Sequence, residues 1–175
     1  MDHMAKNSGF TFLEILIVVF IITLLSGATA TGYTGFNEQK KLDKDTQDMS
    51  STLELAKKKA RAGDKSSLAQ TGTDYSTCEL DGYKVKLLTA TTYQLAASMC
   101  APTVGSCPIV SGCSDVSIAP YALSSSVTMS PATGEVFFNN GGLNVSGITS
   151  VVFTNSKNNK TKTVSIFTSG AIETN

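Results

Sequence analysis

Near its start the sequence reads Gly9-Phe10-Thr11-Phe12-Leu13-Glu14 and continues with Ile15-Leu16-Ile17-Val18-Val19-Phe20-Ile21-Ile22-Thr23-Leu24-Leu25. No charged residue occurs in the 22 positions from 15 to 36. A helix of this length measures roughly 33 Å at about 1.5 Å per residue, which is enough to cross the core of a bilayer. The sequence therefore predicts a membrane-spanning helix that begins beside the carboxylate of Glu14.

The carboxylate of Glu14 is an unusual group at this position. An ionised acid at the centre of a membrane helix costs roughly 2.5 to 3.5 kcal/mol, and less near the end of the helix, so an acid there indicates a functional role. The segment before it, 1–9, is short and polar, and the small residue Gly9 is followed at once by Phe10. Together these features resemble the cleavage signal of type IV prepilins and of the pseudopilins of type II secretion systems.

This resemblance implies that a prepilin peptidase cuts between Gly9 and Phe10 and methylates the new amino group of Phe10. An ordinary secretory signal is cut after its apolar region, whereas here the apolar helix is kept. In this family the acid, here Glu14, pairs with the terminal amine of a neighbouring subunit as the filament grows. At ~4 Å and an effective dielectric constant of about 20 such a pair attracts by about 4 kcal/mol before desolvation is subtracted, so it sets the register of the subunits.

The first nine residues also leave alternatives open. The residue before Gly9 is Ser8, where the family usually has Lys or Arg, and the charged groups of the leader are few: Lys6 and His3, opposed by Asp2. The positive-inside rule therefore orients the helix only weakly. Met4 is an alternative start to Met1. The alternative to processing is an unprocessed membrane-anchored surface protein in which Glu14 lies among lipid head groups.

Composition limits what the rest of the chain can be. A chain of 175 residues provides one long helix and one domain of about a hundred residues. Lys and Arg number 14, as do Asp and Glu, so the overall charge favours neither nucleic acid nor acidic lipid as a partner. The single histidine lies in the leader, and no Gly-rich phosphate loop or paired-acid motif is present. The sequence predicts no cofactor and no catalysis, so the chain is expected to be a substrate of the peptidase and not an enzyme.

All four cysteines follow the apolar segment, at Cys78, Cys100, Cys107 and Cys113. An even number in an exported domain predicts two disulfides, for which three connectivities are open. We favour Cys78 with Cys100, at the ends of two adjacent extended runs, and Cys107 with Cys113, which closes a short loop. A zinc site is the alternative, but it is disfavoured because no Cys-x-x-Cys pair occurs and no histidine follows His3.

The helix is expected to continue beyond the apolar segment, over residues 37–62. Apolar and small residues recur there at alternating spacings of four and three, which predicts a buried stripe against a globular domain. This stripe, called the seam below, consists of Leu42, Thr46, Met49, Leu53, Ala56 and Ala60. The charged residues are expected to point outward: Lys40, Lys41, Asp43, Lys44, Asp45, Asp48, Glu54 and 57–59. Gly63 is expected to cap the end of the helix.

Three glycines, Gly27, Gly32 and Gly35, lie where the apolar segment ends. Each costs roughly 1 kcal/mol relative to Ala in a helix interior, so this is the weakest part of the helix and a place where it can unwind in a filament. The other interpretation is that small residues let helices pack closely. The sequence leaves both open.

Beyond Gly63 the chain is rich in Thr, Ser, Gly and Val, and short alternating runs predict strands at 83–88, 93–99, 127–129, 135–138, 150–154 and 163–168. A turn is expected at Asp81-Gly82 and a loop over 100–120. The expected fold is α+β and pilin-like, with a long helix packed on an antiparallel sheet. The expected divisions are a leader (1–9), a transmembrane or filament-core helix (10–36), an amphipathic helix (37–62) and a disulfide-bridged sheet domain (63–175).

The second half of the chain resembles, at scattered positions, the H-type pseudopilins and T-type minor pilins. The matching segments are 53–62, the turn at 130–134 and the ending 164–172. The two resemblances imply a structural subunit of a type IV pilus or a type II secretion pseudopilus. They imply a single pass through the inner membrane before assembly, with the domain outside, and an extracellular or periplasmic filament afterwards. The implied partners are other pilin subunits, the prepilin peptidase and the inner-membrane assembly platform.

A DNA-binding minor pilin of an uptake pilus is the second functional class. Its candidate site is the cluster Lys57, Lys58, Lys59 and Arg61, and a second basic cluster comprises Lys157, Lys160 and Lys162. The zero net charge disfavours this function, and lysines near a helix C-terminus are explained by the helix dipole.

Overall fold

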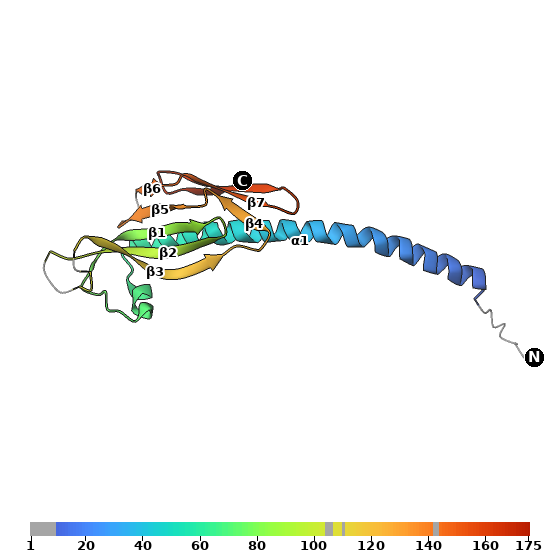
Figure 1. Ribbon diagram of the computed structural model, residues 1–175, viewed down its shortest axis with the longest axis horizontal. Helices are drawn as coiled ribbons and strands as arrows, with labels where there is room; N and C mark the ends of the chain where they lie inside the picture. The colour runs from blue at the N-terminus through green and yellow to red at the C-terminus, as the bar shows by residue number, and fades with distance from the viewer. Residues whose placement is uncertain (1–9, 104–106, 110, 142–143) are drawn as a thin grey trace, which may run out of the picture. The chain divides into compact units, whose positions relative to one another are not determined.

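The computed structural model describes residues 10–103, 107–109, 111–141 and 144–175, except for the side chains of 27–33 and 69–71 (Figure 1). The chain divides into two compact units, Met1–Asn37 and Glu38–Asn175. Each unit is described by itself. The α-helix α1, Phe12–Ala62, contributes residues to both units, and the short 3-10 helix η1, Ser66–Thr71, follows it. The predicted leader, 1–9, lies outside the described residues.

In the second unit, α1 buries the predicted seam. All six seam residues are at most 1% exposed, and the apolar ones belong to one core cluster with residues from the strands. The helix ends as predicted at Gly63, whose φ of 58° is left-handed. The amide of Gly63 donates to the carbonyl of Ala60 (3.3 Å), and the amide of Asp64 donates to the carbonyl of Lys59 (3.1 Å). This is the Schellman arrangement, which satisfies carbonyls that the end of a helix leaves without partners.

One predicted outward residue of α1 is buried. Asp45 is 2% exposed, and its carboxylate accepts hydrogen bonds from the backbone amide (2.8 Å) and the hydroxyl (3.1 Å) of Ser124. The prediction was wrong for this residue because helical spacing shows only that Asp45 borders the seam. A distant loop supplies the two donors that make burial of the carboxylate tolerable.

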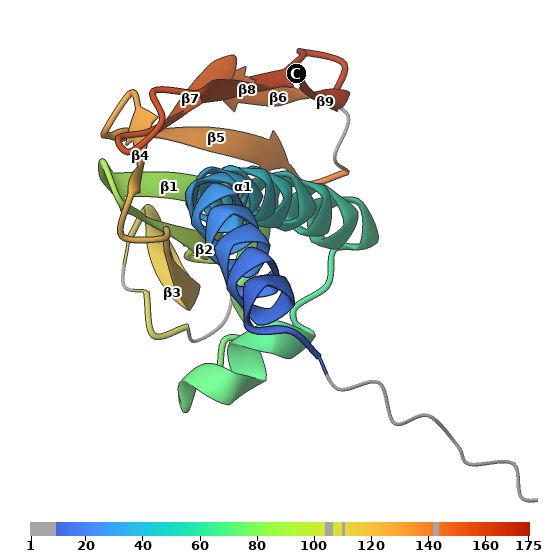
Figure 2. The same ribbon diagram turned by 90° about the vertical axis from the view of Figure 1, so that its right-hand side faces the viewer.

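Within the described residues, nine strands form two antiparallel sheets, whose strands are labelled in Figure 2. The first, sheet A, has the order β3-β2-β1-β5-β6, with β1 at Glu79–Thr89, β2 at Thr92–Cys100, β3 at Cys113–Ala122, β5 at Gly134–Asn139 and β6 at Val145–Gly147. The second, sheet B, has the order β4-β7-β8-β9, with β4 at Val127–Ser130, β7 at Ser150–Asn155, β8 at Thr161–Ile166 and β9 at Ile172–Thr174. These strands confirm the α+β class, but the expected single sheet is two sheets.

Both sheets direct alternate side chains into the same core. Tyr83, Val85 and Leu87 of β1 are buried, as are Val151 and Phe153 of β7. This alternation follows from the pleat of a strand, in which successive side chains point to opposite faces. The helix seam therefore packs against a core that both sheets share.

Two predicted irregular segments are in fact strand. Asp81 and Gly82 lie inside β1, where the register with β2 shifts between Leu80 and Gly82. A Cβ atom at Gly82 would lie 2.1 Å from the carbonyl oxygen of Phe138, so a glycine marks close packing between strands here and not a turn. The second half of the expected loop 100–120 is β3, an edge strand that contains Pro120. Proline disfavoured a strand assignment, but an edge strand tolerates it.

The favoured disulfide pairing was also wrong. The bonds join Cys78 to Cys107 and Cys100 to Cys113. Cys100 and Cys113 lie opposite each other in the register of β2 and β3, with Cα atoms 3.9 Å apart. The prediction failed because it placed no strand at Cys113, which left Cys78 as the only apparent neighbour of Cys100.

We predict that Asp45→Ala lowers the free energy of unfolding by about 2 kcal/mol, because the amide and hydroxyl of the half-buried Ser124 lose a charged acceptor. Urea unfolding followed by circular dichroism measures the change. Asp48→Ala is the matched control, because Asp48 pairs with Lys44 at an exposed site on the same helix and exposed pairs contribute about 0.5 kcal/mol. Equal losses in the two variants would contradict the role of Asp45.

We also predict that Cys113→Ser releases one thiol, at Cys100, and leaves the bond between Cys78 and Cys107 intact. The measurement is alkylation of the folded, unreduced variant followed by sequencing of the labelled peptide. The unreduced wild-type chain, which should take up no label, is the control. Labelling at Cys107 would instead support the pairing that the structure replaces.

Candidate assembly segment and basic surfaces

The described part of the first unit begins with a capped helix start. Thr11 precedes the first helical residue, Phe12, and the amide of Glu14 donates to the Thr11 hydroxyl (3.3 Å) and carbonyl (3.1 Å). Thr-x-x-Glu is the pattern of a capping box, and an acid in the first turn also interacts favourably with the helix dipole. The Thr-x-x-Glu pattern is visible in the sequence itself, at Thr11 and Glu14.

The apolar side chains after Thr11 are exposed on every side of the helix. From Phe10 to Leu25 the large apolar residues are between 48% and 82% exposed. Two hydroxyls are satisfied within the helix: those of Thr23 and Ser26 donate to the carbonyls of Phe20 (2.8 Å) and Ile22 (2.7 Å). A helix that is apolar all round needs a continuous apolar environment, either other chains or lipid.

None of the helices formed by the described residues has the length and hydropathy that a membrane span requires.

Glu14 lies beside a shallow apolar groove. The groove has a volume of about 270 Å³ and is lined by Phe10, Glu14, Ile15, Val18 and Val19. No cation of the described residues pairs with the carboxylate of Glu14, which is exposed. Of the two residues predicted to flank the cleavage site, Phe10 is described and is 79% exposed, whereas Gly9 lies outside the described residues. The carboxylate is therefore available to a cation from another molecule.

The predicted DNA-binding cluster at the end of α1 is largely paired with acids. Lys57 contacts Glu54 (3.5 Å), and Lys59 contacts Asp64 (2.8 Å). The pKa of Asp64 is well below its usual range, chiefly because Lys59 donates a hydrogen bond to its carboxylate. Lys58 and Arg61, the other two cations, are exposed. The structure therefore does not gather the four cations of this cluster into one unpaired basic surface.

The second basic cluster lies at the turn between β7 and β8, where it contacts the start of the second unit. Residues 155–160 form this turn and are called the hairpin tip below. Lys160 Nζ donates to Gln39 Oε1 (2.7 Å), and the side-chain amide of Asn155 donates to the carbonyl (2.9 Å) and to Oε2 (3.1 Å) of Glu38. Beyond the tip, Lys162 pairs with Asp43 (3.0 Å).

Glu38 is the centre of this contact. Its carboxylate accepts hydrogen bonds from Lys41, Ser126 and Asn155, which together lower its pKa from 4.5 to about 2. The carboxylate therefore remains ionised and bonded at any ordinary pH. The hairpin tip is held on α1 by these bonds, because both sheet B and the connection before β4 contribute donors to the same acid.

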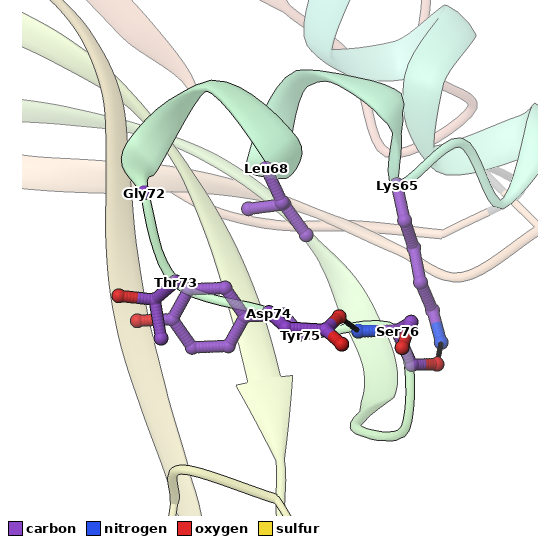
Figure 3. A pocket seen from close by; sticks show the side chains of 7 residues that line it. All are labelled: Lys65, Leu68, Gly72, Thr73, Asp74, Tyr75 and Ser76. Atoms are coloured by element: carbon purple, nitrogen blue, oxygen red, sulfur yellow. Dashed lines mark hydrogen bonds between the residues drawn. The ribbon is translucent and has the colours of Figure 1, made fainter.

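The described residues also contain a further cavity and one grouping of possible metal ligands. A cavity of about 390 Å³ lies beside η1 (Figure 3), but its cation, Lys65, donates to the carbonyls of Ser76 and Cys78, and its acid, Asp74, accepts from the Ser76 amide (2.9 Å). Within the described residues, the one grouping with metal-ligand spacing contains Cys100 and Cys113, whose sulfurs are joined in a disulfide. The charged groups of the cavity and the sulfurs of the grouping are therefore already engaged within the described residues.

Comparison with known proteins agrees with the first resemblance. Residues 4–30 match the prokaryotic N-terminal methylation motif. The chain thus carries the hallmark of type IV pilins and pseudopilins. No curated protein and no solved structure matched the chain. The matched residues include Gly9, Phe10 and Glu14, which are the three residues that the sequence assigned to processing and assembly.

Proposed function

We propose that the chain is a structural subunit of a type IV pilus or a type II secretion pseudopilus. The observation that carries this proposal is the methylation motif at residues 4–30. The exposed apolar helix that follows Thr11 supports it, because that surface requires burial in lipid or against other chains. The α+β domain, with its seam packed on sheets, is compatible with a pilin-like fold.

In the proposed mechanism the same apolar surface is buried in two successive environments. Before assembly the apolar helix resides in the inner membrane, and after assembly the same side chains pack against the helices of other subunits. The change of environment preserves burial of apolar area, so the hydrophobic effect does not oppose extraction of the helix from the bilayer. Thr23 and Ser26 fit both environments because their hydroxyls are bonded within the helix.

Glu14 then provides register between subunits. After cleavage the amine of Phe10 becomes a cation, and an exposed carboxylate beside an apolar groove is suited to receive the amine of the neighbouring subunit. Packing alone tolerates sliding of one smooth apolar helix along another. A single charge pair in an apolar environment selects one alignment. Every other alignment is penalised because it leaves two charges unpaired.

In this proposal the chain is the substrate of the prepilin peptidase and has no catalytic function of its own. The precursor is anchored in the inner membrane with its disulfide-bridged domain outside, and the mature chain resides in a periplasmic or extracellular filament. The two disulfides support an oxidising environment for the domain.

The test of processing is the mass of the mature amino terminus in material isolated from filaments. We expect a chain that begins at Phe10 and carries one added methyl group on its amine. Gly9→Leu should accumulate as the full precursor in the membrane, because the peptidase requires a small residue before the cut. Filaments that contain a chain with an intact leader would contradict the proposal.

The test of register is Glu14→Ala. We expect processing at the wild-type level and at least a tenfold loss of incorporation into filaments, measured by quantitative immunoblot of sheared filaments. Glu54→Ala, an acid on the exposed face of the same helix, is the control and should assemble normally. Equal incorporation of the two variants would show that the carboxylate of Glu14 does not guide assembly.

A further inference from the structure

The hairpin tip brings two lysines to the start of the second unit. Lys157 and Lys160 are both exposed. The bonds of Asn155 to Glu38 and of Lys160 to Gln39 fix the tip on the first two residues of that unit. The turn that carries both lysines is thus held by contacts at both of its ends.

The acids near the tip are already neutralised. Glu38 pairs with Lys41 (2.6 Å), Asp43 with Lys162 (3.0 Å) and Asp48 with Lys44 (2.7 Å). The remaining acid of this part of the helix, Asp45, is buried and bonded to Ser124. Among the described residues, no carboxylate lies within ion-pair distance of the ammonium groups of Lys157 and Lys160. Although the chain is neutral overall, Lys157 and Lys160 give this surface an excess of positive charge.

Chain connectivity limits how far this surface lies from the apolar segment. Gln39 follows the uncharged stretch 15–36 by only three residues, which span at most ~11 Å even when fully extended. The head-group layer adds roughly 5 to 8 Å on each side of a bilayer core of about 30 Å. When residues 15–36 occupy the core, the hairpin tip is therefore within reach of the phosphates of the lipid head groups.

We propose that Lys157 and Lys160 bind anionic phospholipid head groups while the chain is membrane-anchored. This inference rests on the proposed function, because the apolar helix must first reside in the bilayer. Each lysine near an anionic surface strengthens attachment by about fivefold, an effect that is screened within a Debye length of about 8 Å at physiological salt. The contact holds the domain against the membrane, and assembly into a filament breaks it.

The test uses the full chain reconstituted in vesicles that contain either 30% phosphatidylglycerol or phosphatidylcholine alone. Hydrogen exchange followed by mass spectrometry reports on the peptide that covers the hairpin tip. We expect exchange at 156–160 to be about fivefold slower in the anionic vesicles, and we expect 0.5 M salt to abolish the difference. Lys157→Gln with Lys160→Gln should remove the protection, whereas Lys58→Gln with Arg61→Gln, at the other end of the helix, should keep it.

The outcomes separate this inference from the function on which it rests. A chain that fails to co-float with either vesicle would overturn both the membrane anchor and the head-group contact. A chain that co-floats with both vesicles without a difference at the tip would overturn the head-group contact alone. Equal protection by inorganic phosphate or by duplex DNA, added to phosphatidylcholine vesicles, would show that the tip recognises phosphate without need of a membrane, and would likewise overturn it.

Discussion

Packing of the helix seam against both sheets is the contact on which the second unit depends. Sheet A and sheet B are separate hydrogen-bonded ladders, and residues of both contribute to one core. The seam, from Leu42 to Ala60, belongs to the same core cluster as residues of β1 and β7. Two acids of the same helix, Glu38 and Asp45, reinforce this contact by binding the residues between β3 and β4 and the end of β7.

The helix α1 has different surfaces in the two units. From Phe10 to Leu25 the chain exposes apolar side chains in all directions, and the hydroxyls of Thr23 and Ser26 are bonded within the helix. After residue 37 the helix buries one stripe and exposes charges on the other faces. The change occurs where the chain divides into its two units. One part is thus specialised for contacts with other molecules and the other for a self-contained core.

Periodicity predicted those features that are local in sequence. The seam and the cap at Gly63 follow from spacing and from one residue type, and the strands at 127–129, 135–138 and 150–154 follow from alternation. Features set by distant residues were missed. Burial of Asp45 depends on Ser124. The pairing of Cys100 depends on the register of β3, and β3 was not predicted as a strand because it contains Pro120. The methylation motif could be recognised from the sequence because it is one contiguous stretch, 4–30, which includes Gly9, Phe10 and Glu14; the roles of these three residues stay predictions.

The edges of the two sheets have a consequence for a chain that is packed at high density. Of the edge strands, β4, β6 and β9 span only three or four residues, and the long one, β3, contains a proline that cannot donate a backbone hydrogen bond. Such edges are poor templates for the strand pairing that produces amyloid or domain-swapped aggregates. The exposed apolar side chains from Phe10 to Leu25 are therefore a more adhesive surface of the described chain than the sheet edges are.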